Sequence, residues 1–387
     1  MRCLWLAGEC PDVADTGLHV YSRGISEAFA RAGVDVVGIG FARGPANTTA
    51  SVRWQRIDDR RRSARASVLS VRPAMAHSYA TGRYREVLAQ ELASEWDVVA
   101  FDHLQMGWAV PLVRARAPRA VLAYVSQNHE ASVRREVAAR ARGVRRPALA
   151  LDAWKVARLE RRLVLAADVV TAITAEDAAR FAAEVRPGAE VVTVAPGYDG
   201  YIADEARSLW ATPRRAVVLG SFEWHVKEAN LRAFLTAADP LFAAAGAELR
   251  VVGPVREEFA AEMRPLRATT FAGRVPEITS ELLQARIGVI AETVGGGFKM
   301  KALDYAFHRL PIAMVEGSAN GLPLRPPDSV LEFAGVDELA AGVLDALDAV
   351  DRLERVAERA FEAVRAQFDW SSRGRVLREA VERQAAR

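Results

Sequence analysis

Glu292-Thr-Val-Gly-Gly-Gly-Phe-Lys-Met-Lys-Ala-Leu-Asp-Tyr-Ala306 follows a short apolar run, Arg286-Ile-Gly-Val-Ile-Ala291, and leads into a segment with helical spacing. Glycines between a strand and a helix let backbone N–H groups approach an anion, because no Cβ stands in the way. The helix behind them contributes unpaired amides and a partial positive charge. The segment therefore suits a phosphate group, although a glycine-rich turn with two solvated lysines explains the local pattern equally well.

Charged side chains in the same segment narrow the class of ligand. Lys299 and Lys301 add two full positive charges, and Asp304 follows one helical turn later. Cations stabilise phosphates, whereas a carboxylate accepts hydrogen bonds from ribose hydroxyls. The pattern favours a nucleoside diphosphate, with a simple favourable charge near a helix N-terminus as the other explanation of Asp304.

The length and composition indicate a globular protein of two domains. The chain has 387 residues, of which 51% are hydrophobic and 26% charged, and a formal net charge of +3. A single core rarely grows to this size. Because acidic and basic residues nearly balance, the charge does not indicate nucleic-acid binding. Arginines concentrate in residues 53–72 and 134–162; such stretches are usually solvated surface, and an anionic acceptor site or a membrane-surface patch are the alternatives.

The sequence lacks the patterns of disulfide-rich, metal-binding, secreted and membrane-spanning proteins. The two cysteines, Cys3 and Cys10, form neither a disulfide framework nor a metal-binding spacing. The apolar run that starts at Met1 is too short and too lightly charged for a signal peptide. No apolar run has the roughly 20 residues of a membrane span. We expect a cytoplasmic protein, with contact to the cytoplasmic face of a membrane left open.

Apolar, strand-like runs alternate with helical segments along the chain, which predicts α/β domains with parallel sheets covered on both faces. Two such series in tandem predict two Rossmann-like domains facing a cleft, joined by a linker at residues 196–213. The predicted strands of the two series are residues 3–7, 34–40, 97–101, 120–125, 168–173 and 190–195, then 216–220, 248–253, 269–273, 286–291 and 311–315. Residues 336–387 are predicted to be helical, with a break at 368–374.

The order of the motifs resembles the GT-B-fold glycosyltransferases, and specifically the retaining enzymes of glycosyltransferase family 4 in their triple-glycine branch. The resemblance covers nearly the whole chain. The segments that carry it are Asp15-Thr-Gly17, Phe101-Asp-His103, Ser126-Gln-Asn-His-Glu130, Gly220-Ser-Phe-Glu-Trp224 with Asn230, Phe271-Ala-Gly-Arg-Val275, Gly295 to Ala306, and Phe368-Asp-Trp370.

The resemblance implies a division of labour between the domains. Residues 1–200, with a C-terminal helix at 371–387 that crosses back, would form the acceptor-binding domain, and residues 205–370 the nucleotide-sugar-binding domain. The implied catalytic residue is His103, and the implied acceptor-binding residues are Asn128, His129 and Glu130. The implied donor-binding residues are Gly17, Ser221, Lys227, Gly295, Gly296, Gly297, Phe298, Lys299, Lys301 and Asp304.

The implied activity is transfer of a hexose from a nucleoside-diphosphate sugar, UDP or GDP by default, to an acceptor hydroxyl with retention. No metal ligand or further cofactor is expected, since no Asp-x-Asp motif occurs. The acceptor, whether a glycan, a lipid-linked molecule or a natural product, and the oligomeric state stay open. The abundance of Ala and Arg is typical of a GC-rich bacterial genome.

Two departures from the family pattern motivate an alternative. The first of the two glutamates common in the family falls on Gly296, with Glu292 nearby but not equivalent, and Ser221 replaces a frequent arginine. A non-catalytic glycosyltransferase-like binding protein or partner subunit is therefore the second hypothesis. A nicotinamide-dependent dehydrogenase is disfavoured, because residues 8–17 lack the Gly-x-Gly-x-x-Gly fingerprint.

Overall fold

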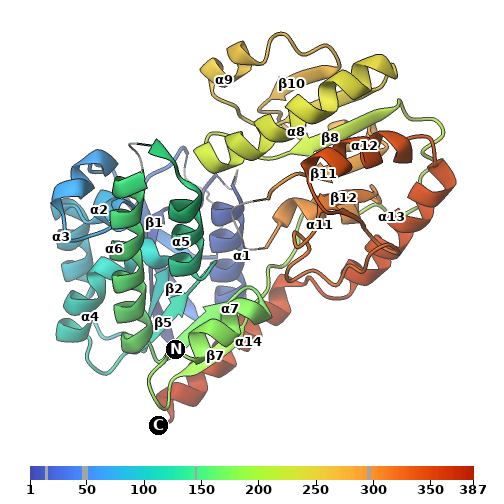
Figure 1. The fold of residues 1–387 in the computed structure, drawn as a ribbon. Coiled ribbons are helices and arrows are strands. Elements are labelled where there is room, and N and C mark those ends of the chain that lie inside the picture. The colour runs from blue at the N-terminus through green and yellow to red at the C-terminus, as the bar shows by residue number, and fades with distance from the viewer. Residues whose placement is uncertain (14–15, 46–50, 144–145, 294–297) are drawn as a thin grey trace. The chain divides into compact units, whose positions relative to one another are not determined.

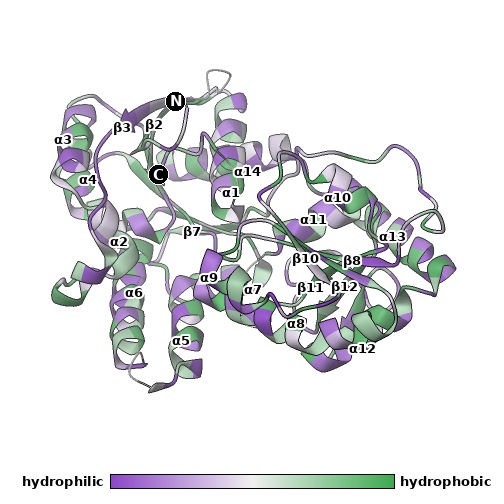
Figure 2. Ribbon diagram, turned by 90° about the horizontal axis from the view of Figure 1, so that it is seen from above, coloured by the Kyte–Doolittle hydropathy of each residue, from purple (hydrophilic) through white to green (hydrophobic). Residues whose placement is uncertain are grey.

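The computed structural model describes residues 1–13, 16–45, 51–143, 146–293 and 298–387 of the protein. Strands and helices alternate along these residues, as the sequence predicts (Figure 1). Helices such as α8, α12 and α13 carry both hydrophobic and hydrophilic residues (Figure 2), as expected where one side of a helix packs on a core and the other meets water.

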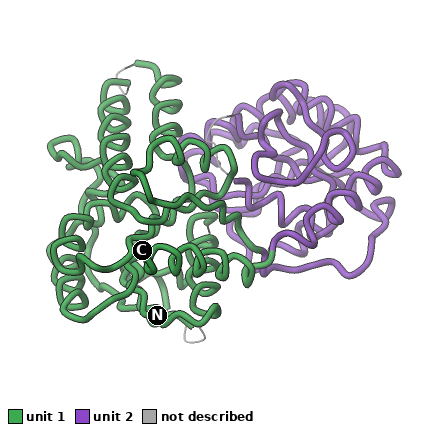
Figure 3. Tube along the Cα trace, turned by 90° about the horizontal axis from the view of Figure 1, so that it is seen from below, with its two compact units in different colours: residues 1–197, 369–387 green, residues 198–368 purple. Residues whose placement is uncertain are grey.

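The described residues divide into two compact units (Figure 3). Unit 1 comprises residues 1–197 and 369–387, and unit 2 comprises residues 198–368. Each unit has its own hydrophobic core, built from the strands of its sheet and the helices that cover them. Both units are α/β domains with parallel sheets, so the prediction of two Rossmann-like domains is confirmed.

Unit 1 contains a seven-stranded sheet within its described residues. Its strands are β1 (Arg2–Glu9), β2 (Asp35–Phe41), β3 (Arg53–Ile57), β4 (Val98–Asp102), β5 (Val121–Val125), β6 (Val169–Ala172) and β7 (Glu190–Thr193). Its helices are α1 (Gly17–Arg31), η1 (Ala64–Leu69), α2 (Ala74–Tyr79), α3 (Gly82–Glu91), η2 (Leu104–Ala109), α4 (Val110–Arg116), α5 (Glu130–Arg140), α6 (Arg146–Ala166), α7 (Ala175–Ala182) and α14 (Trp370–Ala385).

The strand order of unit 1 defines where a ligand can approach the sheet. The order is β3-β2-β1-β4-β5-β6-β7, and the paired strands are parallel. Every residue of β4, β5 and β6 is buried, because helices cover both faces of the sheet. The chain runs outward from β1 to β3 and then returns to β4 on the other side of β1. The carboxyl ends of β1 and β4 therefore flank a topological switch point, the usual ligand position in such sheets.

Unit 2 repeats this plan with a six-stranded sheet in its described residues. Its strands are β8 (Arg215–Leu219), β9 (Glu248–Val252), β10 (Thr269–Gly273), β11 (Ile287–Ile290), β12 (Ile312–Val315) and β13 (Leu331–Phe333). Its helices are α8 (His225–Ala244), α9 (Glu257–Glu262), α10 (Thr279–Leu283), α11 (Met300–Phe307), α12 (Val336–Ala346) and α13 (Val350–Arg365). The order β10-β9-β8-β11-β12-β13 places the switch point of this sheet between β8 and β11.

The C-terminal helix returns to the N-terminal unit, as predicted. Helix α14 packs on α1, and the ring of Trp370 lies 5.9 Å from that of Tyr21. Two glycines allow this close approach: a Cβ on Gly24 would lie 2.1 Å from Trp370, and one on Gly374 would lie 2.0 Å from the carbonyl oxygen of Ala28. Small residues at the crossing therefore let the two helices pack closely.

Some local predictions were wrong or incomplete. Strands β3 and β13 were not predicted, because these edge strands are too polar or too short to show an apolar run. Of the motif Asp15-Thr-Gly17, Asp15 lies outside the described residues, Gly17 begins α1 and the side chain of Thr16 caps that helix. Pro147 lies in the first turn of α6, where a helix tolerates proline because the missing N–H has no partner there.

Candidate functional site

The candidate donor site of unit 2 lies at the switch point between β8 and β11. Ser221 follows β8, and Glu292 follows the neighbouring strand β11. The predicted phosphate-binding glycines Gly295, Gly296 and Gly297 lie outside the described residues. Lys299 is the N-cap residue of α11, and Lys301 is in its first turn. The polar end of one strand, the end of its neighbour and a helix N-terminus thus meet at one edge of the sheet.

Lys301 and Glu292 form an ion pair at this edge. The Nζ atom of Lys301 lies 2.5 Å from Oε1 of Glu292, and their side chains are 12% and 8% exposed. Burial disfavours the charged carboxylate, but Lys301 and Lys299 outweigh that effect and lower the pKa of Glu292 below its ordinary value. The second oxygen of Glu292 has no hydrogen-bond partner among the described residues. Glu292 therefore holds Lys301 in place while one of its oxygens stays unsatisfied.

A further cation, Lys227, faces the same carboxylate from α8. Burial, together with the charges of Lys301 and Lys299, lowers the pKa of Lys227 to about 8. Lys227 forms no ion pair in the described part of the chain, although the charge of Glu292 favours its protonated form. Three ammonium groups thus surround one carboxylate in the described residues of this edge. The excess positive charge suits an anion such as a diphosphate.

Asp304 lies one turn beyond Lys301 on α11, beside Tyr198 and Asp199. Burial and the neighbouring charge of Asp199 raise the pKa of Asp304 to about 7, while a hydrogen bond from Tyr198 and the charge of Lys301 oppose that shift. The ring of Tyr198 stacks on Phe307, with 4.3 Å between the ring centroids. Asp304 is therefore a carboxyl group close to half-protonated near neutral pH, fixed beside an aromatic ring.

The other predicted donor residues occupy separate positions. The hydroxyl of Ser221 lies 3.5 Å from Oε2 of Glu223, and Ser221 is half-buried. The ring of Phe298 lies 5.7 Å from that of Phe368. Gly17, predicted to contact the donor, lies in unit 1, where it is exposed at the first position of α1. The structure thus brings Lys227, Lys301 and Asp304 to one part of unit 2.

The predicted catalytic residue, His103, directly follows β4 at the switch point of unit 1 and is the N-cap residue of η2. Its backbone has φ 68°, a conformation that is uncommon for a residue with a side chain. Its Nε2 atom lies 3.2 Å from Oε1 of Glu130. The backbone N–H of Gln105 donates a long hydrogen bond, 3.5 Å, to Nδ1, so Nε2 is the ring nitrogen that meets Glu130. His103 is therefore oriented by Glu130 from one side.

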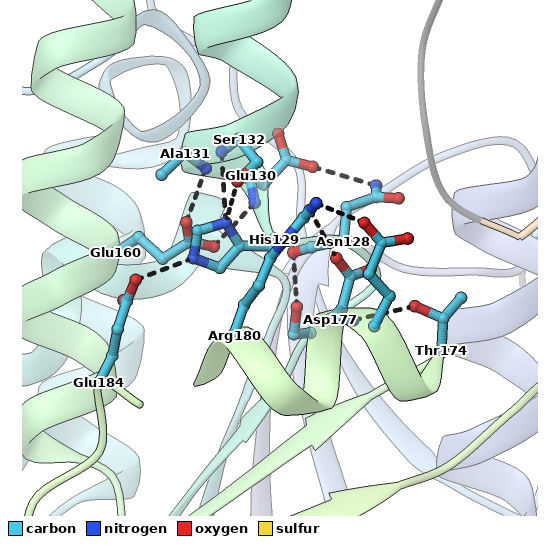
Figure 4. Close-up of polar contacts among 12 residues, drawn as sticks. Asn128, His129, Glu130, Ala131, Ser132, Glu160, Thr174, Asp177, Arg180 and Glu184 are labelled. Atoms are coloured by element: carbon cyan, nitrogen blue, oxygen red, sulfur yellow. Dashed lines mark hydrogen bonds and ion pairs between the residues drawn. The ribbon is translucent and has the colours of Figure 1, made fainter. Parts of the chain in front are cut away.

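The segment of Asn128 to Glu130 supplies this orienting carboxylate (Figure 4). Burial disfavours the charge of Glu130, but the hydrogen bond from His103, the charges of His103 and Arg134 and the amide of Asn128 together lower its pKa to about 2. His129 turns the other way: it caps α5, and its ring nitrogens lie 2.7 Å from Oγ of Ser132 and 3.2 Å from Glu184. Glu130 thus faces His103, whereas the neighbouring His129 faces Ser132 and Glu184.

Glu160 on α6 completes this arrangement and was not predicted. Its carboxylate accepts hydrogen bonds from the backbone N–H groups of Glu130, at 3.0 Å, and Ala131, at 2.7 Å, and its side chain is fully buried (Figure 4). Burial and the nearby charge of Glu130 raise its pKa to about 8, although the backbone hydrogen bonds oppose that shift. The sequence signal was a single glutamate among the apolar positions of α6, such as Val156, Leu163 and Val164.

A second polar group that sequence reasoning missed surrounds Glu9, at the carboxyl end of β1. Its carboxylate lies 3.2 Å from Nε2 of His19 and 3.3 Å from Nε of Arg43, and it also pairs with Arg61. Burial disfavours its charge, yet the hydrogen bond from His19 and the charge of Arg61 lower the pKa of Glu9. The switch point of unit 1 is therefore polar on the side of β1 as well as on that of β4.

Two further observations concern the described residues alone. They contain no group of three or more His, Cys, Asp or Glu side chains arranged to hold a metal ion. None of their helices is both long and apolar enough to cross a membrane.

Known proteins resemble this chain in the sequence of unit 2 and in the fold of both units. Residues 213–349 match the family described as glycosyl transferases group 1. No curated protein matches the chain in sequence. The solved structure of sucrose-phosphate synthase from Thermosynechococcus elongatus is similar with a TM-score of 0.75 at 14% identity, over 100% of this chain and 99% of that chain. HepE of Anabaena in complex with UDP and glucose gives a TM-score of 0.69 at 12% identity, over 99% and 100%. The crystal structure of TarM is similar with a TM-score of 0.70 at 8% identity, over 98% of this chain and 98% of that chain.

The structural likeness and the family match cover different parts of the chain. At such low identity the structural likeness shows the fold, which extends over both units. The family match spans β8 to α12 and so contains Lys227, Glu292, Lys301 and Asp304. Residues 213–349 thus match the glycosyl transferases group 1, and the whole chain shares the two-domain fold of these solved structures.

Proposed function

We propose that the protein transfers a hexose from a UDP-sugar to an acceptor hydroxyl, with retention of configuration and without a metal ion. The charge distribution at the switch point of unit 2 is the observation that carries this proposal. Lys227, Lys299 and Lys301 surround the single carboxylate of Glu292 there, among the described residues. Fixed cations at that place stabilise the charge that grows on a departing diphosphate.

The proposed donor follows from the relatives and from the chemistry of unit 2. The HepE structures hold UDP, glucose and UDP-glucose, so UDP-glucose is the first donor to test and a GDP-sugar the second. In this proposal Lys227 and Lys301 bind the diphosphate, and Asp304 accepts hydrogen bonds from the ribose. The pKa of Asp304 near 7 falls when hydroxyl groups donate to its carboxylate, because such bonds favour the ionised form.

The proposed reaction needs little covalent chemistry from the protein. The bond between the anomeric carbon and the diphosphate oxygen breaks, and UDP leaves with the electron pair. The acceptor oxygen attacks from the same side of the sugar, and its proton passes to the departing phosphate oxygen. His103 in unit 1 is proposed to orient the transferred sugar through a hydrogen bond, with Glu130 holding its ring. Asn128, His129 and Glu130 remain the proposed acceptor-side residues.

The test is nucleotide binding followed by turnover. Thermal-shift measurements with UDP, GDP, TDP, ADP and NAD⁺ compare the wild type with Lys227→Met, each with and without EDTA. A ligand at a hundred times its dissociation constant stabilises a protein by about 2.7 kcal/mol, which such a measurement detects. We expect a shift with UDP, unaffected by EDTA. Loss of one charge-assisted hydrogen bond should weaken UDP binding to Lys227→Met by about 1–3 kcal/mol.

Arg355→Met is the matched control, because it removes one exposed cation from α13, elsewhere in unit 2. Equal UDP affinity in the wild type and Lys227→Met would contradict the site assignment. UDP binding without hydrolysis or transfer of UDP-glucose would favour a non-catalytic sugar-nucleotide-binding protein. A shift with NAD⁺ alone would overturn the transferase proposal.

A further inference from the structure

Unit 1 exposes a group of large apolar side chains on a short segment before α2. Leu69 is 96% exposed, Val71 is 85% exposed and Val68 is 59% exposed. Single exposed apolar residues are normal on a protein surface, but a contiguous group usually marks an interaction site. The segment belongs to η1 and the residues that follow it, and it lies in one of the arginine-rich stretches of the sequence.

Helix α6 extends this apolar surface. Lys155 of α6 donates hydrogen bonds to the carbonyl oxygens of Ser67, at 2.8 Å, and Val68, at 3.3 Å, so the helix lies directly against η1. Figures 1 and 2 show α2 beside α6, and Asp152 of α6 accepts a hydrogen bond from the first residue of α2. On α6, Leu151 and Trp154 stay 41% and 57% exposed next to this contact. We call Val68, Leu69, Val71, Leu151 and Trp154 the η1 surface.

Positive charges surround the η1 surface. Arg60, Arg62 and Arg65 are exposed in the same segment, and their guanidinium groups form no ion pair with the described residues. Burial together with the charges of Arg85 and Arg62 lowers the pKa of Arg72. The pKa of His77 is also lowered, by burial and by the charges of Arg62, Arg72 and Lys155. Each of these shifts reflects cations close together, so the surface carries a positive potential that an anionic partner would relieve.

A hollow adjoins the η1 surface at Arg72. Its volume is about 470 Å³, and it is lined by Arg72, Arg85, Glu86, Ala89, Trp108, Pro111 and Leu112. The guanidinium of Arg85 lies over the ring of Trp108, at 5.3 Å from its centroid. Two arginines at an apolar wall match a molecule with an anionic head and a hydrocarbon tail.

We propose that the η1 surface docks on a membrane that contains anionic phospholipids. Leu69, Val71 and Trp154 would enter the boundary between headgroups and acyl chains, where apolar and aromatic side chains are stabilised. Arg62, Arg65 and Arg72 would meet lipid phosphates. The arginines beside these apolar side chains outnumber the acidic residues there, which is why the charge favours an anionic lipid surface.

Vesicle sedimentation with the full chain tests this proposal without any measurement of sugar transfer, so its outcome is independent of the proposed function. We expect the wild type to sediment with vesicles of phosphatidylcholine and phosphatidylglycerol, and not with phosphatidylcholine alone. Each of the substitutions Leu69→Glu and Val71→Glu should weaken binding about tenfold or more, because it removes the burial of one large apolar side chain. Arg65→Gln should weaken it about fivefold and reduce its dependence on salt.

Leu165→Glu is the matched control, since Leu165 is 43% exposed at the opposite end of α6. It should leave vesicle binding unchanged, and circular dichroism should show all four variants folded. Equal sedimentation with neutral and anionic vesicles, or unchanged binding of Leu69→Glu, would overturn the proposal. So would a wild type that forms a dimer which Leu69→Glu dissociates, because a second copy would then cover the surface. Stabilisation by inorganic phosphate without vesicle binding would also overturn it, in favour of a site for a free anion.

Discussion

Replacing Lys301 by methionine should destabilise unit 2 in a manner that depends on pH. Lys301 forms an ion pair with Glu292, and both side chains are largely buried. Methionine preserves the packing of the aliphatic chain near Phe222, whose ring centroid lies 5.9 Å from the ammonium nitrogen. The variant therefore removes the charge with little loss of volume and leaves Glu292 without its nearest counter-ion.

The expected loss of stability follows from the free energy needed to protonate the unpaired carboxylate of Glu292. Glu292 can become protonated, which at pH 7 and from an ordinary pKa of 4.5 spans 7 − 4.5 = 2.5 pH units. At about 1.36 kcal/mol per unit, that protonation costs about 3.4 kcal/mol. The remaining charges of Lys227 and Lys299 reduce this cost, so we expect a loss of about 2–3 kcal/mol, near the scale for breaking a buried pair.

The sign of the pH dependence is fixed by the pKa of Glu292. In the wild type that pKa is lowered, so its contribution to stability is present above pH 4.5 and is lost as the pH falls through the folded-state value. In Lys301→Met the pKa rises, and protonation becomes cheaper as the pH falls. At pH 5 the same arithmetic gives about 0.7 kcal/mol, so the difference between variant and wild type should shrink several-fold.

Hydrogen exchange of the amides of β12 measures this effect, because these central strand amides exchange through opening of unit 2. Lys301→Met with Glu292→Gln should recover most of the lost stability, since the double variant leaves no buried charge of this pair. The exposed Arg355→Met should change stability by less than about 0.5 kcal/mol. A loss in Lys301→Met that is the same at pH 5 and pH 7, or that Glu292→Gln does not relieve, would refute the reasoning.

Two other outcomes follow from the structure. Because the pKa of Lys227 is about 8, we expect UDP affinity in calorimetric titrations to fall as the pH rises above about 8, by up to tenfold per pH unit, with proton uptake on binding; a flat profile in the wild type would show that Lys227 does not meet the diphosphate. Gly24→Ala should lower the free energy of unfolding of unit 1 by about 1–3 kcal/mol in urea denaturation, because its Cβ would clash with Trp370, whereas Gly82→Ala, with no atom within 4 Å, should be neutral or slightly stabilising. Equal midpoints for the two alanine variants would mean that α14 shifts at little cost.

Much of the fold could be predicted from the sequence, because buried parallel strands and capped helices leave local patterns. The runs that became β4, β5 and β11 are apolar throughout, as strands covered on both faces must be. Thr174 caps α7, where its side chain accepts a hydrogen bond from the backbone N–H of Asp177, and the sequence Thr174-Ala-Glu-Asp177 has the local pattern of such a cap. The edge strands β3 and β13 could not be predicted. Each pairs with a neighbouring strand on one side only, so its sequence is less uniformly apolar than that of a central strand.

The candidate site divides in the same way. The sequence by itself indicated Lys299, Lys301 and Asp304, because all three follow a glycine-rich segment at the start of one predicted helix. Only the tertiary structure decided their partners: Lys227 comes from α8, and Tyr198 comes from a segment more than a hundred residues before Asp304. Local spacing encodes the period of a helix and the caps at its ends, whereas the pairing of distant charges depends on the order of strands in the sheet, which brings the ends of β8 and β11 together.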